Sequence, residues 1–201
     1  MNNLQLSTKI HLWFYPKFYN QEKITIEEAN WASQLPLKRK REYIFSRGYL
    51  RKSLSKLFNL DPLEIPIKAK PGEAPKLKKG FGNVSLSHCK DAILIGWYKD
   101  NLGVDIERKD RKIKEILVRK YIYNDIKISK INKSFLESNY CILGWCAKES
   151  AIKWEQGSLL INIKNWAIDE DFNSIKNKLS KTRLNLKYIS YRNWMITCAY
   201  K

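Results

Sequence analysis

Several patterns that would identify a class of protein are missing from this sequence. The four cysteines form no CxxC pair and stand at no zinc-ligand spacing from either of the two histidines, which argues against a zinc site. No apolar run approaches the roughly 18 residues that a membrane span needs. The N-terminal residues show no basic segment followed by a long apolar stretch, so we expect a soluble, reduced, cytoplasmic protein without disulfides.

Acidic residues are also scarce relative to basic ones. The chain has 20 Asp and Glu against 38 Lys and Arg, which gives a formal net charge of +18. A surface this basic attracts polyanions, namely nucleic acid, an anionic membrane, a phosphorylated cofactor or an acidic protein, and the charge alone does not choose among them. The 201 residues, 44% of them hydrophobic, suffice for one large domain or two small ones with a real core.

Periodicity and turn signals predict a chain that mixes strands and helices. We expect a long basic helix over residues 37–60, a hairpin of strands at 84–88 and 92–98, and a third antiparallel neighbour of that hairpin at 101–106. Further expected elements are a strand at 9–15, a helix that begins at Thr25, helices at 113–123 and 136–154, and strands at 184–190 and 194–200. This order predicts an α+β chain with two similar halves, 1–98 and 99–201, which together form one compact unit.

Three carboxylates stand out against the basic background. Asp105 and Glu107 are two residues apart in an apparent strand, so both would lie on one face, where like charges repel. Glu149 lies on an expected helix, four residues before Lys153. The Glu149–Lys153 pair by itself is explained by a surface ion pair, and the basic helix by simple solvation. Together, however, three carboxylates from a strand and a helix can hold Mg²⁺, which prefers oxygen ligands and often binds substrate phosphates as well.

The ordered motifs resemble those of the 4′-phosphopantetheinyl transferase superfamily. They are Ser87-His88, then Gly103-Val104-Asp105-Ile106-Glu107, then Trp145-x-x-Lys148-Glu149-Ser150-x-x-Lys153. Within the superfamily the chain is similar to the surfactin-synthetase-activating type, which fuses two pseudo-repeats. The run AIKWEQGSL at 151–159 resembles the cyanobacterial branch. The resemblance extends from about residue 37 to residue 199, and three separated motifs in the right order make it specific.

The resemblance implies a fold, a reaction and partners. The implied fold is two α+β halves related by a pseudo-twofold axis, in a monomer. The implied reaction moves 4′-phosphopantetheine from coenzyme A to a serine of an apo carrier protein and releases adenosine 3′,5′-bisphosphate. Carrier proteins of fatty-acid, polyketide or peptide synthesis are small acidic domains, which a cationic surface would attract. The resemblance includes no nucleic acid and no membrane among the partners.

The resemblance also implies roles for particular residues. Asp105, Glu107 and Glu149 match the ligands of Mg²⁺, for which Mn²⁺ can substitute. Glu149 further matches the proposed general base, acting on the serine hydroxyl directly or through a water molecule, and Lys153 completes the catalytic set. Coenzyme A contacts are implied for the basic helix and for both later motifs: Lys38, Arg39, Arg47, Arg51, Ser87, His88, Lys148 and Lys153.

Two departures and two rival functions accompany the resemblance. Relatives commonly have Gly-Lys-Pro in the cofactor loop, where this chain has Gly-Glu-Ala-Pro at 72–75, so either Glu73 points away from the phosphates or Lys76 replaces the missing lysine. Asp125 stands about where many relatives have a further glutamate. One rival function is a nucleic-acid-binding module, suggested by the charge and the many aromatic residues. The other is an Mg²⁺-dependent phosphohydrolase that uses the same acids on a nucleotide.

Overall fold

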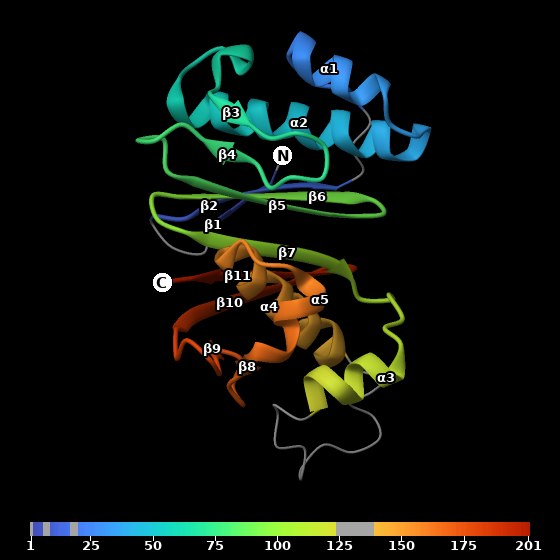
Figure 1. Ribbon diagram of the computed structural model, residues 1–201, viewed down its shortest axis with the longest axis vertical. Helices are drawn as coiled ribbons and strands as arrows, with labels where there is room; N and C mark the ends of the chain where they lie inside the picture. Colours follow the sequence, from blue (N-terminus) through green and yellow to red (C-terminus); the bar gives the residue numbers. More distant parts are fainter. Residues whose placement is uncertain (1, 6–8, 17–19, 124–138) are drawn as a thin grey trace. The chain divides into compact units, whose positions relative to one another are not determined.

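The computed structural model describes residues 2–5, 9–16, 20–123 and 139–201. The chain divides into two compact units, Met1–Lys99 and Asp100–Lys201. Each unit combines helices with an antiparallel sheet, so the expected α+β class is confirmed (Figure 1).

The first unit contains a four-stranded sheet in the order β1-β2-β6-β5. Its strands are β1 (Asn2–Gln5), β2 (His11–Pro16), β5 (Asn83–Cys89) and β6 (Ala92–Tyr98). Between β2 and β5 the chain forms α1 (Ile26–Ser33), α2 (Leu37–Phe58), the 3₁₀ turn η1 (Pro62–Glu64) and the short pair β3 (Ile67–Lys68) and β4 (Lys76–Leu77). The expected basic helix and the expected hairpin are both present.

Local sequence explains where the helices of this unit begin and end. Thr25 caps α1 in a capping box, in which its hydroxyl accepts from the Glu28 amide and the Glu28 carboxylate accepts from the Thr25 amide. Helix α2 ends at Asn59, which adopts the left-handed conformation that asparagine tolerates well. The apolar side of α2, which includes Leu50 and Leu54, packs on Ile93 and Ile95 of the sheet.

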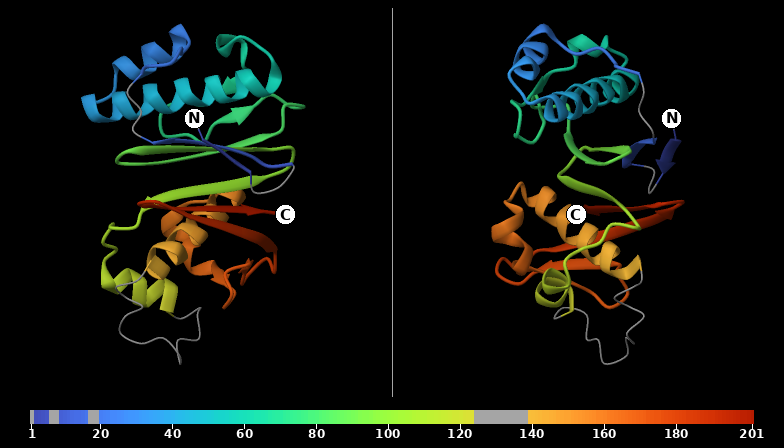
Figure 2. Two further views of the ribbon diagram at one scale, coloured as in Figure 1. Left: turned by 180° about the vertical axis from the view of Figure 1, so that it is seen from behind. Right: turned by 90° about the vertical axis from the view of Figure 1, so that its right-hand side faces the viewer.

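The second unit contains a five-stranded sheet in the order β7-β11-β10-β9-β8. Its strands are β7 (Leu102–Arg108), β8 (Trp166–Ile168), β9 (Ser174–Asn177), β10 (Arg183–Tyr191) and β11 (Trp194–Tyr200). Its helices are α3 (Glu115–Val118), the π-helical turn η2 (Arg119–Tyr123), α4 (Asn139–Glu155), α5 (Leu159–Asn162) and the 3₁₀ turn η5 (Ile163–Asn165). Helix α4 crosses one face of the sheet, and the core of the unit lies between them (Figure 2).

The expected pairing of β7 with the β5–β6 hairpin is wrong. Both edges of β6 are occupied, one by β5 and the other by β2, so β6 has no free edge for the strand that follows it. Strand β7 instead pairs along its whole length with β11, from Leu102 opposite Tyr200 to Arg108 opposite Trp194. The two acids therefore belong to the sheet of the second unit.

The two units share a core of one strand, one long helix and one hairpin. In each, the strand precedes the long helix, the hairpin comes later in the chain, and the strand pairs with the last strand of the hairpin. In the first unit these elements are β2, α2, β5 and β6, and in the second unit they are β7, α4, β10 and β11.

The cysteines and the helices of the described residues can be compared with what the sequence led us to expect. All four cysteines are free, as expected. Among the described segments, every helix is too short or too polar to cross a membrane.

Candidate metal centre

Strand β7 presents alternate side chains to helix α4. Gly103, Asp105 and Glu107 share one face of the strand, whereas Val104 and Ile106 point to the other face. Helix α4 approaches this face so closely that a Cβ atom on Gly103 would lie 1.8 Å from the Ser150 carbonyl oxygen. Glycine at 103 is therefore required for the contact, and the contact brings α4 over the two acids.

The Ser150 side chain fastens helix α4 to the same sheet. The Ser150 hydroxyl shares a hydrogen bond with the Thr197 hydroxyl, and it also donates to the Cys146 carbonyl at 2.9 Å. Thr197 lies directly opposite Asp105 in the β7–β11 ladder. Because Ser150 follows Glu149, the bond to Thr197 fixes the height of Glu149 above Asp105.

The three predicted metal ligands meet at this contact. One oxygen of each of Asp105, Glu107 and Glu149 lies within 4.8 Å of the other two. Asp105 is 1% exposed, whereas Glu107 and Glu149 are partly exposed, so the cluster opens toward solvent on one side. The strand supplies two of the acids and the helix supplies the third.

Each acid already has a positively charged or hydrogen-donating partner. Lys153 Nζ donates to Asp105 Oδ1 at 2.7 Å. Arg111 pairs with Glu107, and the Trp145 indole N–H donates to Glu149 Oε1.

Cys146 lies near these acids. The pKa of its thiol is well above the usual value, chiefly because the thiol is buried and also because of the negative charge of Asp105.

Glu149 has the most perturbed ionisation at the site. The pKa of Glu149 is raised to about 7, chiefly by burial and then by the nearby charge of Asp105, while Lys153 and the Trp145 hydrogen bond oppose the rise. A carboxyl group with this pKa exchanges its proton near neutral pH. It therefore has the property that a general base in this pH range requires.

The donor set fits a hard divalent cation. Three carboxylates offer only oxygen, which suits Mg²⁺ and Mn²⁺ better than softer metals. Octahedral Mg²⁺ with bonds of about 2.1 Å holds neighbouring ligand oxygens about 3 Å apart and opposite ones about 4.2 Å apart. The three oxygens, which lie within 4.8 Å of one another, would therefore have to approach by up to about 1.8 Å on binding, through rotation of the side chains. The cation would also relieve the repulsion that raises the pKa of Glu149.

Lys148 lies apart from this cluster. Its side chain is 1% exposed and its Nζ atom donates to the Ile163 carbonyl at 3.3 Å, on the side of α4 that faces η5. A contact of Lys148 with a cofactor phosphate would require this ammonium group to leave the core. The buried hydrogen bond indicates a structural role for Lys148.

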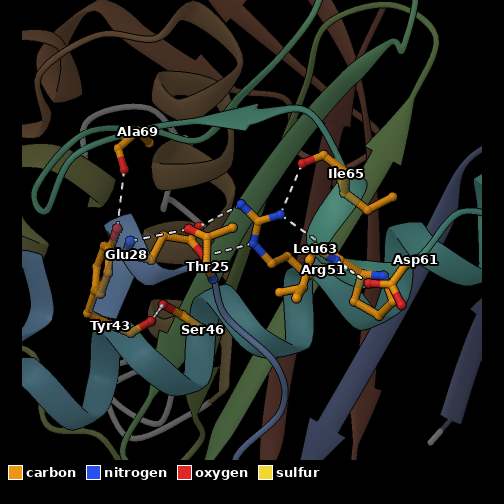
Figure 3. A network of polar contacts seen from close by, with 10 residues as sticks. Thr25, Glu28, Tyr43, Ser46, Arg51, Asp61, Leu63, Ile65 and Ala69 are labelled. Atoms are coloured by element: carbon orange, nitrogen blue, oxygen red, sulfur yellow. Dashed lines mark hydrogen bonds and ion pairs between the residues drawn. The ribbon is translucent and has the colours of Figure 1, made fainter. Parts of the chain in front are cut away.

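Arg51, in the first unit, is held by a network of protein acceptors (Figure 3). Its guanidinium makes two hydrogen bonds to Glu28, at 2.8 and 3.1 Å, and two more to the Pro62 and Ile65 carbonyls at 3.0 Å each. Both Arg51 and Glu28 are less than 6% exposed in their side chains. Arg51 thus joins α1, α2 and η1, and few of its N–H groups are left for a phosphate.

Arg47, one helical turn earlier, has a different environment. It is 4% exposed, stacks on the Tyr43 ring at 5.1 Å and donates a hydrogen bond from Nη2 to the Glu73 carbonyl at 3.3 Å. Its buried Nε atom has no acceptor among the described residues. At least this donor of Arg47 is therefore left for an anion near the 70–75 loop.

Glu42 links two other predicted cofactor residues. Its carboxylate accepts from Arg39 at 3.3 Å and lies 3.8 Å from His88 Nε2. Lys38 is exposed near the start of the same helix, α2. Ser87 is buried and, as the neighbour of His88 in β5, points to the opposite face of the sheet.

The unusual acid of the cofactor loop is used within the loop itself. The Glu73 carboxylate accepts from the Lys70 backbone N–H at 3.1 Å. Glu73 thus bends back on its own turn, which Gly72 permits with a φ of 89°. Lys76, the expected replacement for the missing lysine, is exposed at the start of β4.

No family model matches this chain, and no curated protein matches it.

Three residues with contacts to these groups were not assigned a role from the sequence. Arg111 pairs with Glu107, Trp145 holds Glu149, and Glu42 links Arg39 and His88. The spacing of four residues between Glu107 and Arg111 could have indicated their ion pair. The same spacing occurs at Glu115 and Arg119 on the surface, so it does not by itself indicate a functional site. Asp125 lies outside the described residues.

Proposed function

We propose that this protein transfers 4′-phosphopantetheine from coenzyme A to a serine hydroxyl of an apo acyl or peptidyl carrier protein. The observation that carries the proposal is the meeting of Asp105, Glu107 and Glu149, with Lys153 beside them. These residues come from two motifs that are 42 residues apart, measured from Glu107 to Glu149, and the fold brings them to within 4.8 Å. The same motifs carry the resemblance to the transferase superfamily.

The proposed reaction is a phosphoryl transfer. The serine oxygen forms a bond to the phosphorus that bears pantetheine, the bond from that phosphorus to the bridging oxygen breaks, and adenosine 3′,5′-bisphosphate leaves with the electron pair. The serine proton passes to Glu149, directly or through a water molecule. Mg²⁺ bound by the three acids would neutralise charge on the diphosphate.

The chain's own side chains arrange this chemistry. Trp145 fixes one oxygen of Glu149 through the indole N–H, which leaves the other oxygen for the metal or for the serine proton. Lys153 has a half-buried ammonium group that is paired with Asp105. When a cation replaces that pairing, Lys153 becomes a donor for an oxygen of the diphosphate.

The first unit offers the residues proposed to hold the nucleotide end of coenzyme A. Arg47 has a buried Nε without an acceptor among the described residues, and Lys38, Arg39 and His88 of α2 and β5 supply further positive or hydrogen-bonding groups. Arg guanidinium groups suit phosphate because of their fork of N–H donors. The contacts of Arg51 and Lys148 make those two residues supports of the fold in this proposal.

The core of strand, long helix and hairpin that the two units share supports the two-pseudo-repeat fold that the resemblance implies. The net charge of +18 supports an acidic macromolecular partner, because such a charge speeds encounter with an acidic domain. Carrier proteins of fatty-acid synthesis are the first partners to test, followed by those of polyketide and peptide synthesis. The monomeric state and a cytoplasmic location remain part of the proposal.

Intact-mass spectrometry tests the reaction directly. Apo carrier protein is incubated with the protein, coenzyme A and Mg²⁺, with one sample in EDTA and one with the Asp105→Ala variant. A metal-dependent gain of one phosphopantetheine group, lost in both controls, supports the proposal. No gain on any of the three carrier types would refute it.

The same samples distinguish the rival functions. An Mg²⁺-dependent phosphohydrolase would cleave coenzyme A into phosphopantetheine and adenosine 3′,5′-bisphosphate without a carrier protein, because water replaces serine. A nucleic-acid-binding module would leave coenzyme A intact and would bind single strands with an affinity that falls steeply as salt rises. Each outcome gives a different set of masses or a different titration.

A further inference from the structure

The side chain of Arg111 contacts residues of both elements that carry the acids, strand β7 and helix α4. It pairs with Glu107 at the end of β7, and its guanidinium carbon lies 5.7 Å from the ring centroid of Trp145 on α4. Trp145 in turn donates to Glu149, and the charge of Arg111 itself favours the ionised form of Glu149. Arg111 therefore acts on two of the three proposed metal ligands.

A cation in this position has consequences for metal binding. Arg111 occupies Glu107 Oε1, and a metal on either oxygen of that carboxylate would be repelled by the nearby guanidinium, because two cations at one carboxylate repel. Arg111 is 40% exposed in its side chain, so it can swing toward solvent without loss of a packed core. The guanidinium would then stand next to the metal, where a bound diphosphate presents its oxygens.

We propose that Arg111 is an exchangeable counter-ion of the metal site. In the absence of metal, Arg111 pairs with Glu107. When the divalent cation binds, Arg111 releases Glu107 and contacts the diphosphate that binds with the cation. This inference rests on the proposed function for the identity of the diphosphate. It predicts that Arg111 weakens the binding of metal alone and strengthens the binding of metal together with coenzyme A, which is a coupling between the two ligands.

The test measures Mn²⁺ binding, by the electron paramagnetic resonance signal of free Mn²⁺, with and without saturating coenzyme A. The variants are Arg111→Ala, which removes the cation, and Arg111→Lys, which keeps it. Arg119→Ala is the matched control, because Arg119 pairs with Glu115 at the same i,i+4 spacing on the surface, away from the three acids. An exposed or partly exposed ion pair gives effects of about two- to fivefold.

In the absence of coenzyme A, Arg111→Ala should bind Mn²⁺ about two- to fivefold more tightly than the natural chain. Coenzyme A should then tighten Mn²⁺ binding less in Arg111→Ala than in the natural chain, with Arg111→Lys intermediate and Arg119→Ala unchanged. Unchanged or weaker Mn²⁺ binding in Arg111→Ala would overturn the inference, since a purely positioning role predicts weaker binding. An undiminished coenzyme A effect in Arg111→Ala would overturn it as well.

The failure of this inference is distinct from failure of the proposed function. Carrier modification by the natural chain, together with unchanged Mn²⁺ binding in Arg111→Ala, would refute the role of Arg111 alone. Tighter Mn²⁺ binding and a smaller coenzyme A effect, without modification of any carrier, would retain the role of Arg111 and refute the transferase.

Discussion

Replacing Glu149 with glutamine should stabilise the metal-free protein, and the gain should depend on pH. The pKa of Glu149 is raised from the ordinary 4.5 to about 7 in the folded chain, chiefly by burial. Between these two values the folded state holds a proton that the unfolded state releases. The free energy of unfolding of the natural chain therefore falls as pH rises from about 4.5 to about 7.

The magnitude follows from the same two pKa values. With about 7 in the folded state and 4.5 in the unfolded state, the contribution changes by about 2.5 kcal/mol between pH 5 and pH 8. Glutamine carries no charge at either pH, and its amide oxygen can still accept from the Trp145 indole. The stability difference between Glu149→Gln and the natural chain should therefore grow by about 2.5 kcal/mol over that range.

Urea denaturation in EDTA at pH 5 and pH 8 measures this difference. Glu115→Gln, which changes an exposed glutamate paired with Arg119, is the control and should shift by less than about 0.5 kcal/mol. Adding Mg²⁺ at pH 8 should stabilise the natural chain and should stabilise Glu149→Gln much less, because the variant lacks one ligand. A stability difference that is equal at both pH values would refute the assigned environment of Glu149.

Three further substitutions test the site and the fold. Gly103→Ala should weaken Mn²⁺ binding and lower the free energy of unfolding by about 2 kcal/mol or more, because its Cβ would lie 1.8 Å from the Ser150 carbonyl oxygen; Mn²⁺ titration and urea denaturation check both effects. Asp105→Ala should reduce transfer by at least about 100-fold in the mass assay while the circular dichroism spectrum stays unchanged, because Lys153 can turn to solvent. Arg51→Ala should lower the free energy of unfolding by about 3–5 kcal/mol, measured in urea, because Glu28 would be left buried without its cation.

Matched controls isolate these effects. Val104→Ala changes the same strand on the opposite face and should cost stability without a specific loss of metal affinity. Arg39→Ala removes an exposed arginine from the same helix as Arg51 and should change the free energy of unfolding by less than about 0.5 kcal/mol. Equal losses in Arg39→Ala and Arg51→Ala would contradict the buried network of Figure 3.

Local patterns predicted the elements well because local forces determine them. The capped start at Thr25 is present, and the helix expected at 37–60 is observed as Leu37–Phe58. The predicted hairpin is present as β5 with β6, and the two strands predicted near the C-terminus are present as β10 and β11. Strands β8 and β9 were not predicted, because three or four residues are too few to show an alternating pattern.

The sequence did not predict which strands that are distant in the chain pair with each other. Residues 101–106 follow β6 after a short break, and neighbouring strands in the chain usually pair. The edge of β6 that β7 would have needed is occupied by β2, a strand about 80 residues before β6. Only the tertiary arrangement of β2 reveals this, and it moves the two acids into a sheet with β11. The nearness of Glu149 to them then depends on Gly103, whose role is steric and has no local signature.

Arg47 and Arg51 show why a motif match alone does not assign a binding role. They are one helical turn apart on α2, and both are buried. Both also match the basic helix of the superfamily that the chain resembles. Glu28 and two carbonyls take four N–H groups of Arg51, whereas Arg47 donates to the Glu73 carbonyl and keeps a buried Nε without an acceptor among the described residues. A phosphate gains little from a guanidinium that must first leave a buried carboxylate, and it gains more from one with a donor that is already desolvated and without an acceptor. Arg47 is therefore the arginine of this helix whose loss should raise the KM for coenzyme A, and Arg51 the one whose loss should destabilise the unit.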